Sequence, residues 1–167
     1  LFFLFILILL CCCSRQKLGL GTSRVESNTT LRLNKIQFFD DRTGFIAGGV
    51  QYSQPLLLKT SDGGRHWSTI QLPSQVEQKE IYGLDLFPDG KIITVGYGGT
   101  IYTSSDSGQH FQYVQHSSWK ELRAVSFRNA SEALIAGGVG FDKGHLSFFR
   151  TDGLGQNVIY EDRNFEL

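Results

Sequence analysis

Short apolar runs separated by Gly, Asp and Asn follow one another from Asn34 to Tyr160. Within each run apolar and polar residues alternate, and no segment keeps the spacing of an amphipathic helix. Alternation with a period of two is typical of β-strands that bury one face. The pattern therefore predicts an all-β fold.

The runs fall into three groups of four predicted strands. They are expected at Lys35–Phe39, Gly44–Gly48, Leu56–Lys59 and Trp67–Leu72, then at Tyr82–Phe87, Lys91–Val95, Thr100–Thr103 and Phe111–Gln115, and last at Arg123–Phe127, Ala133–Ala136, Leu146–Arg150 and Asn157–Tyr160. All three groups share one register, because the same two positions before an equivalent glycine are apolar each time. These are Ile36 and Phe38 before Gly48, Leu84 and Leu86 before Gly96, and Val125 and Phe127 before Gly137.

A turn motif separates the third and fourth strands of the first two groups. Thr60–Trp67 reads Thr-Ser-Asp-Gly-Gly-Arg-His-Trp, and Ser104–Phe111 reads Ser-Ser-Asp-Ser-Gly-Gln-His-Phe. A short acidic side chain accepts hydrogen bonds from its own turn, and glycine supplies a left-handed backbone. The aromatic residue then begins the next strand and fills the core. We predict a structural role for Thr60, Asp62, Gly64 and Trp67, for Ser104, Asp106, Gly108 and Phe111, and for Asp152 in a weaker third copy.

The acidic residues of these turns recur about every 45 residues, a period typical of propellers and other arrays. Four strands in a unit of that length make a propeller blade. An active site needs one set of acids, whereas a repeated fold element needs one per blade. The recurrence of Asp62, Asp106 and Asp152 therefore favours structural turns over catalytic acids.

Residues 95–111 resemble a known family of repeats. They are similar to Asp-box (bacterial neuraminidase) repeats and more closely to photosystem II assembly/stability-factor propellers, whose blades typically read Val-Gly-x-x-Gly-Thr-Ile-x-x-Ser/Thr-x-Asp-x-Gly-x-x-Trp. The matching residues are Val95, Gly96, Gly99, Thr100, Ile101, Ser104, Asp106, Gly108 and Phe111, the last in place of Trp. The resemblance covers roughly residues 34–160 and implies a β-propeller fragment of three four-stranded blades at 34–73, 79–116 and 119–160.

Three blades are fewer than the roughly 4–8 that close a propeller. Residues 161–167 are too few for another blade, and we expect them to begin a continuation. A truncated C-terminus and the assembly of identical chains are the two explanations.

The N-terminal run Leu1–Leu10 is apolar throughout but shorter than the roughly 20 residues of a transmembrane helix. It ends in Cys11–Cys13, which hold all three cysteines, and the chain begins without Met, as a truncated N-terminus would. Residues 1–13 resemble a bacterial lipoprotein signal with Cys13, or else Cys12, as the lipid acceptor. A cleaved signal or a short membrane anchor are the alternatives. Polar residues 14–33 read as a tether, so we expect an exported protein, periplasmic or bound to the outer membrane as a lipoprotein.

Composition excludes several other functions. Lys and Arg balance Asp and Glu at 16 each, whereas general nucleic-acid binding requires a basic surface. No histidine outside the turns has a partner at zinc-like spacing, and no cysteine remains for a disulfide. The Gly-rich Gly137–His145 lacks the Gly-Lys-Ser/Thr order of a phosphate loop. We therefore expect no metal and no cofactor.

The second and third strands are joined by more residues in the first and third blades than in the second. The additional residues fall at Val50–Pro55 and Val139–Gly144, on the face opposite the acidic turns. Because loops on one face of a repeat array often bind partners, we predict a partner-binding rim. Its candidate residues are Tyr52, Phe141, Asp142 and Lys143. Simple drift in loop length explains the same pattern.

Two functions follow as hypotheses. The first is a non-catalytic binding or assembly module, secreted or lipid-anchored, with a protein partner. The second is a sialidase-like glycoside hydrolase, since Asp boxes also occur in that superfamily. Such enzymes carry an Arg-Ile-Pro motif, but Pro55, Pro73 and Pro88 follow Gln, Leu and Phe. The sequence therefore favours the binding module.

Overall fold

The computed structural model describes residues 25–73, 79–115, 121–139, 143–151 and 158–163, with side chains through Gly138. The predicted signal, most of the tether, the third turn at Asp152, and Phe141 and Asp142 lie outside the described residues. Within them no helix is long or apolar enough to cross a membrane.

Twelve strands and one short 3-10 helix make up the described part of the chain. They are β1 (Arg32–Phe38), β2 (Gly44–Val50), β3 (Gln54–Thr60), β4 (Ser68–Thr69), β5 (Ile81–Phe87), β6 (Lys91–Gly96), η1 (Tyr97–Gly99), β7 (Thr100–Ser104), β8 (Gln112–Gln115), β9 (Glu121–Asn129), β10 (Glu132–Val139), β11 (Lys143–Thr151) and β12 (Val158–Arg163).

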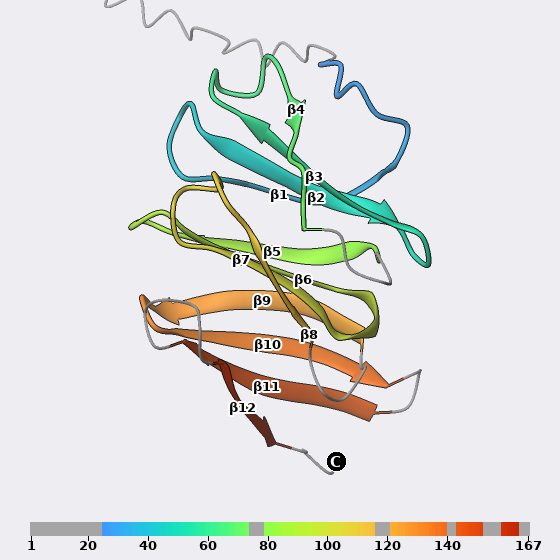
Figure 1. Cartoon of the computed structure of the whole chain (residues 1–167), viewed down its shortest axis with the longest axis vertical. Coiled ribbons are helices and arrows are strands. Elements are labelled where there is room, and N and C mark those ends of the chain that lie inside the picture. Colours follow the sequence, from blue (N-terminus) through green and yellow to red (C-terminus); the bar gives the residue numbers. More distant parts are fainter. Residues whose placement is uncertain (1–24, 74–78, 116–120, 140–142, 152–157, 164–167) are drawn as a thin grey trace, which may run out of the picture.

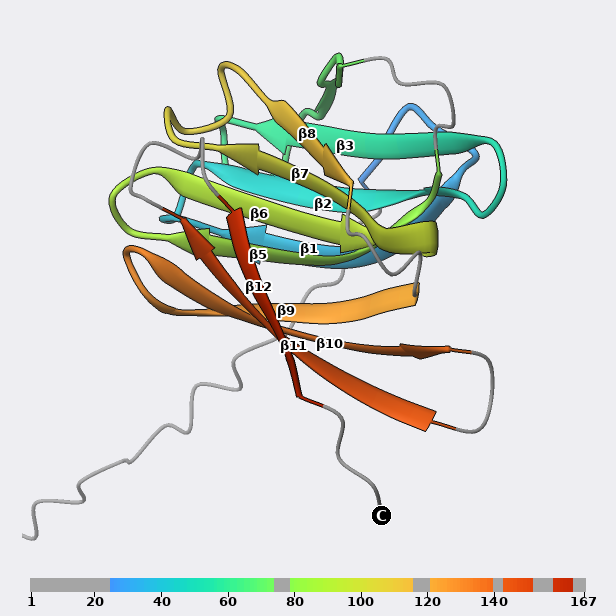
Figure 2. The same cartoon turned by 60° about the horizontal axis from the view of Figure 1, so that its bottom comes forward.

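The strands form three four-stranded antiparallel sheets in sequence order, β1–β4, β5–β8 and β9–β12. The sheets stack on one another, with the second between the first and the third (Figure 1). The turned view shows the twist of each sheet and the same stacking (Figure 2). The prediction of an all-β fold of three blade-like sheets is confirmed.

The fourth strand of the first blade is much shorter than predicted. It was expected at Trp67–Leu72, but β4 contains only Ser68 and Thr69. Beyond them Ile70 still donates a backbone hydrogen bond to Leu57, 2.8 Å long, while Ile70 and Leu72 pack against the core between the first two sheets. These side chains therefore pack on that core although the strand itself ends at Thr69.

The period of two seen in the sequence reflects burial between sheets. The apolar side chains form three clusters, two between neighbouring sheets and one on the outer side of the first sheet. One joins the first and second sheets and contains Phe45, Ala47, Leu57, Ile81, Leu84, Leu86, Ile92, Tyr102 and Phe111. Another joins the second and third sheets and contains Ile93, Val95, Ile101, Leu122, Ala133 and Ile135, and the last lies on the outer side of the first sheet and contains Ile46, Leu56, Leu58 and Trp67.

Glycine is required at the three equivalent positions for the same physical reason. A Cβ at Gly48, Gly96 or Gly137 would lie 1.9, 2.2 or 2.1 Å from the carbonyl oxygen of Arg32, Glu80 or Glu121, which lie at the start of the first strand or directly before it. No other residue fits such an approach of two backbones. The glycines therefore permit the first and second strands of each blade to pair closely.

Polar contacts tie the first strands of the three blades together. The side-chain amide of Gln37 on β1 donates to Oδ1 of Asp85 on β5, at 2.6 Å. The backbone N–H of Phe127 on β9 donates to Oδ2 of the same carboxylate, also at 2.6 Å. Asp85 thus links all three sheets through one side chain.

Candidate functional site

The turn at residues 60–67 is organised by its acidic side chain. Oδ1 of Asp62 accepts hydrogen bonds from the backbone N–H groups of Arg65 and His66, at 2.9 and 3.0 Å. The hydroxyl of Thr60 donates to the same oxygen at 2.8 Å and accepts from Gly64 N–H at 3.0 Å. Oδ2 lies 2.6 Å from Nδ1 of His66.

The turn at residues 104–111 repeats this geometry. Oδ1 of Asp106 accepts from the backbone N–H groups of Gln109 and His110, each at 3.0 Å. The hydroxyl of Ser104 donates to it at 2.8 Å and accepts from Gly108 N–H at 3.0 Å. Asp62 and Asp106 therefore accept backbone hydrogen bonds within their own turns, as predicted. We refer to residues 60–67 and 104–111 as the two Asp turns.

These bonds stabilise the ionised form of both carboxyls. The backbone N–H of His66 is the largest cause that holds the pKa of Asp62 well below its ordinary 3.8, and the backbone N–H of His110 does the same for Asp106. A carboxylate held ionised by its own backbone is poorly suited to act as a general acid.

The aromatic residues that follow the turns are both buried. Trp67 is 8% exposed and Phe111 is 9% exposed, which confirms that prediction. The indole N–H of Trp67 donates to the carbonyl of Gly64 at 3.1 Å, so the ring is tied to its turn.

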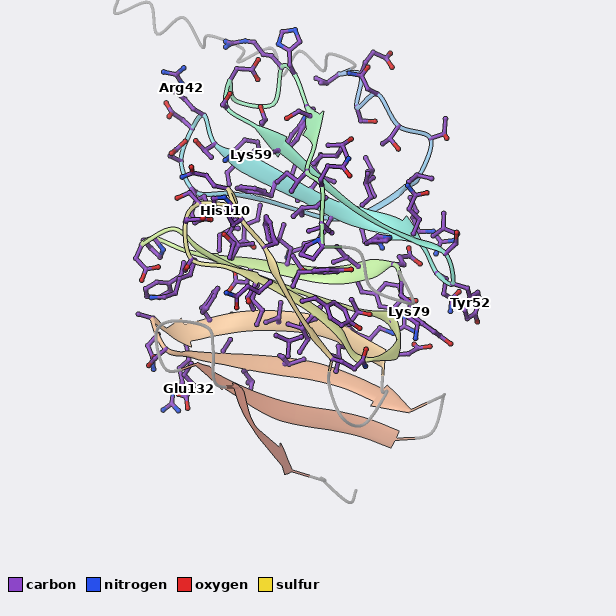
Figure 3. All side chains as sticks on the ribbon, in the orientation of Figure 1. Arg42, Tyr52, Lys59, Lys79, His110 and Glu132 are labelled. Carbon is purple, nitrogen blue, oxygen red and sulfur yellow. The ribbon has the colours of Figure 1, made fainter. Side chains whose placement is uncertain are left out.

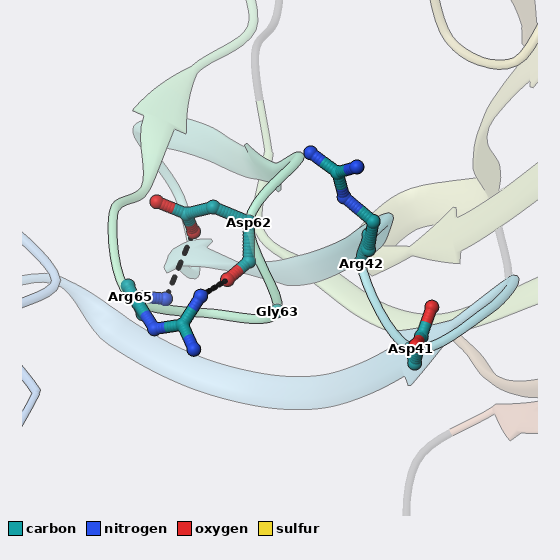
Figure 4. Close-up of a pocket in the computed structure, with 5 residues that line it drawn as sticks. All are labelled: Asp41, Arg42, Asp62, Gly63 and Arg65. Atoms are coloured by element: carbon teal, nitrogen blue, oxygen red, sulfur yellow. Dashed lines mark hydrogen bonds between the residues drawn. The ribbon is translucent and has the colours of Figure 1, made fainter.

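A pocket of ≈ 330 Å³ opens beside the first Asp turn (Figure 4). Asp41, Arg42, Asp62, Gly63 and Arg65 line it. Arg65 donates to the carbonyl oxygen of Asp62 at 3.2 Å. Two carboxylates and two guanidinium groups balance in charge, so the pocket favours neither a cation nor an anion. No group of three or more His, Cys, Asp or Glu among the described residues could hold a metal ion.

The opposite end of the blades carries the predicted rim, where Figure 3 places Tyr52 and Lys79, far from Arg42 and His110. The additional residues of the first blade lengthen the β2–β3 hairpin, in which Val50 pairs with Gln54. At its tip Tyr52 is 72% exposed and meets Tyr97 of η1 edge-on, with ring centroids 5.0 Å apart. A hydrogen bond with Tyr52, assisted by burial, raises the pKa of Tyr97.

Charged residues from the first strands and the interblade linker surround this aromatic pair. Lys79 is nearly buried, with Nζ 5.8 Å from the ring centroid of Tyr97. Glu80 is fully buried, and its Oε1 accepts from Asn34 Nδ2 at 2.8 Å and pairs with exposed Arg32 at 3.5 Å. Its Oε2 has no hydrogen-bond partner among the described residues.

A second aromatic contact lies where the second and third blades meet. The guanidinium of Arg123 on β9 stacks over the ring of Tyr82 on β5, 4.5 Å from its centroid, and pairs with Glu121. Burial, with a further contribution from Glu80, raises the pKa of Tyr82 to about 12. We call Arg32, Tyr52, Lys79, Tyr97 and Arg123 the rim cluster.

Sequence reasoning found only part of this cluster. Of the predicted rim residues, Tyr52 is placed here, and Lys143 begins β11 with its side chain outside the described residues. Arg32 and Arg123 lie at or near the starts of first strands, and Tyr97 follows the marker glycine Gly96. Their places at the start of a first strand or directly after a marker glycine were the available signal, because every blade has these positions at the same end.

Comparisons with known proteins agree at the level of fold. No family model matches the chain, and no curated protein matches it. A structure of YCF48 bound to D1 peptide matches with a TM-score of 0.65 and 16% identity, over 83% of this chain and 41% of that one. The fold is that of a β-propeller. A structure of YCF48 from Cyanidioschyzon merolae matches with a TM-score of 0.51 and 14% identity, over 87% of this chain and 60% of that one.

YCF48 is a photosystem II assembly factor, so these matches agree with the kind of propeller that the sequence resembles. The chain spans 41% and 60% of the lengths of the two YCF48 structures.

Proposed function

We propose that this chain is a non-catalytic propeller module that binds a segment of another protein at the rim cluster. The observation that carries the proposal is the exposed Tyr52 held against Tyr97, at the end of the blades where Arg32 pairs with Glu80 and Arg123 with Glu121. Tyrosine and arginine are enriched where proteins meet, because they combine apolar contact area with hydrogen bonding.

The rim cluster is organised before any partner arrives. Tyr52 is supported by Tyr97, and the guanidinium of Arg123 is held flat against Tyr82. Ordering such side chains in advance lowers the entropy lost on binding. Arg32 and Arg123 remain more than half exposed while paired with Glu80 and Glu121, which leaves donors for a carboxylate of the partner, and the face of Tyr52 suits an apolar side chain.

A D1 peptide is the first ligand to test, since one of the similar structures is YCF48 bound to D1 peptide. We expect fluorescence anisotropy to detect binding, and Tyr52→Ala to weaken it by roughly tenfold or more, as for an interface hot spot. Arg32→Ala and Arg123→Ala should each weaken binding more at low salt than at high salt, because salt screens the charge interactions that these variants remove. Arg42→Ala, at the other end of the blades, is the matched control and should leave affinity unchanged. Equal loss from Tyr52→Ala and Arg42→Ala would place binding elsewhere.

The alternative of a sialidase-like hydrolase has no supporting observation among the described residues. The carboxylates of Asp62 and Asp106 accept hydrogen bonds from the backbone of their own turns. The neighbours by structure are assembly factors, which supports a role without catalysis.

We further propose that the protein is exported and lipid-anchored at Cys13 or Cys12. The support is an apolar run too short to span a membrane and cysteines found only at its end. Expressed in a bacterium, the chain should fractionate with membranes and label with palmitate, and Cys11→Ser, Cys12→Ser and Cys13→Ser together should abolish both. A soluble, unlabelled protein in the periplasm would instead indicate an ordinary cleaved signal.

A further inference from the structure

Four tyrosines of the chain form two ring pairs of similar geometry. Tyr52 and Tyr97 meet with ring centroids 5.0 Å apart and an interplanar angle of 77°. Tyr102 and Tyr113 meet at 5.4 Å and 60°. The first pair joins two blades, because Tyr52 lies in the β2–β3 hairpin of the first blade and Tyr97 in η1 of the second. The second pair lies within one blade, directly opposite across β7 and β8.

The two pairs differ in their access to solvent. Tyr52 is 72% exposed at the outer edge of the rim (Figure 3), and Tyr97 is half-buried. Tyr102 is fully buried, and its hydroxyl has no hydrogen-bond partner among the described residues. A reagent dissolved in water therefore reaches the pair of Tyr52 and Tyr97 but not the ring of Tyr102.

The contact between Tyr52 and Tyr97 involves their hydroxyls as well as their rings. A hydrogen bond with Tyr52 raises the pKa of Tyr97. On each ring the two ortho carbons flank the hydroxyl, and these carbons share the unpaired electron when a phenol loses one electron and its proton. A contact between the hydroxyls therefore holds the reactive carbons of the two rings next to each other.

We propose that Tyr52 and Tyr97 are a site of oxidative cross-linking, at which a carbon–carbon bond joins the two rings as dityrosine. Each phenol loses one electron and its hydroxyl proton, and the two radicals form one bond between their ortho carbons. The hydrogens displaced from those carbons restore the two hydroxyls, so the net loss is two electrons and two protons. Hydrogen peroxide, activated by a haem peroxidase, takes up both electrons and both protons and leaves as two molecules of water.

The new bond fastens the first blade to the second at the rim. It closes a covalent loop from residue 52 to residue 97, which restricts the unfolded chain as a disulfide does. The cross-linked protein should therefore unfold at a higher urea concentration than the untreated protein.

Treatment of the dilute full chain with hydrogen peroxide and a haem peroxidase tests the proposal. Tryptic cleavage places Tyr52 in peptide 43–59 and the other three tyrosines of the two pairs in peptide 92–120. We expect a product of monomeric mass with the fluorescence of dityrosine, in which mass spectrometry finds these two peptides joined with the loss of two hydrogen atoms. A thiol reductant added before digestion breaks any disulfide of Cys11–Cys13 and leaves the carbon–carbon bond intact.

Three variants assign the bond to its residues. Tyr52→Phe and Tyr97→Phe should each abolish the product, because phenylalanine has no hydroxyl proton to lose, and each should keep the circular dichroism of the wild type. Tyr82→Phe removes another hydroxyl at the same end of the blades and should leave the yield unchanged. A yield that survives Tyr52→Phe, a product found only as a covalent dimer, or no dityrosine in the wild type would overturn the proposal. A link within peptide 92–120 that forms as readily would contradict the selection of this pair by its access to solvent.

Discussion

The first and second blades share a sequence pattern but differ in what lies against them. Corresponding hydrogen bonds of their two Asp turns differ by at most 0.1 Å. Yet Ile36 is 54% exposed while its counterpart Leu84 is 1% exposed. The turns are set by local sequence, whereas burial of the first strand is set by the neighbouring sheet.

The aromatic residues of the two turns are buried to the same degree, but against different neighbours. Phe111 is buried between the first and second sheets, while Trp67 is buried to the same degree on the open side of the first. Trp67 achieves this within its own blade, against Leu58 and with its ring edge-on to Phe38, 6.1 Å between centroids. The larger indole replaces part of the cover that another blade gives Phe111.

The largest expected effect is loss of either aromatic residue. Trp67→Ala and Phe111→Ala should each lower the free energy of unfolding by about 3–5 kcal/mol, as for other buried aromatic side chains. Urea denaturation measures both. Native-state hydrogen exchange sharpens the comparison, since Trp67→Ala should expose amides of the first blade and Phe111→Ala those of the first two. A loss below about 1 kcal/mol in either variant would show that its ring is not a core anchor.

The next effect separates the covered from the open first strand. Leu84→Ala should cost about 2–5 kcal/mol, because the side chain is removed from a closed core. Ile36→Ala should cost less than about 1 kcal/mol in the single chain, because the side chain is already half in water. Both are measured by urea denaturation against the wild type. Equal costs would contradict the difference in burial.

Ile36 and Leu84 also show how much of the structure could be predicted from the sequence. Alternation predicted the strands and their common register, and the motif predicted the hydrogen bonds of Asp62 and Asp106, because both depend on residues close in sequence. The pattern is the same at Ile36 and Leu84, so it could not predict which of them is covered. Likewise the contact of Tyr52 with Tyr97 depends on how two blades stack, and no spacing within one blade encodes it.

Lowering the pH should destabilise the first and second blades alike, and by less than the substitutions above. Asp62 and Asp106 have pKa values in the folded chain well below the ordinary 3.8. Their contribution is therefore complete above about pH 5 and is lost progressively as the pH falls below about 4 and through the folded pKa values. Urea denaturation across this range should show a slope that flattens when Asp62→Asn and Asp106→Asn are combined.

Asp41→Asn is the control for this acid effect. Asp41 lies on the same side as Asp62 but makes none of these turn hydrogen bonds within the described part of the chain. Its replacement should leave the slope in place. A slope that persists in the double variant would assign the acid sensitivity to other carboxylates.

The smallest effect concerns the residue after each aspartate. Gly63 and Ser107 hold the same left-handed backbone, with φ of 74° and 58°. An L-residue pays roughly 1–2 kcal/mol for this conformation, but glycine loses about 0.5–1 kcal/mol more chain entropy on folding. Ser107→Gly should therefore stabilise the second blade by about 0.5 kcal/mol, since its backbone bonds to Gly90 and Lys59 remain available. The reverse change, Gly63→Ser, should destabilise by more, because a Cβ there would also lie 2.9 Å from the carbonyl oxygen of Asp41. Thermal unfolding of the two variants measures the asymmetry, and a Ser107→Gly variant less stable than the wild type would mean that the serine hydroxyl contributes more than the strain it imposes.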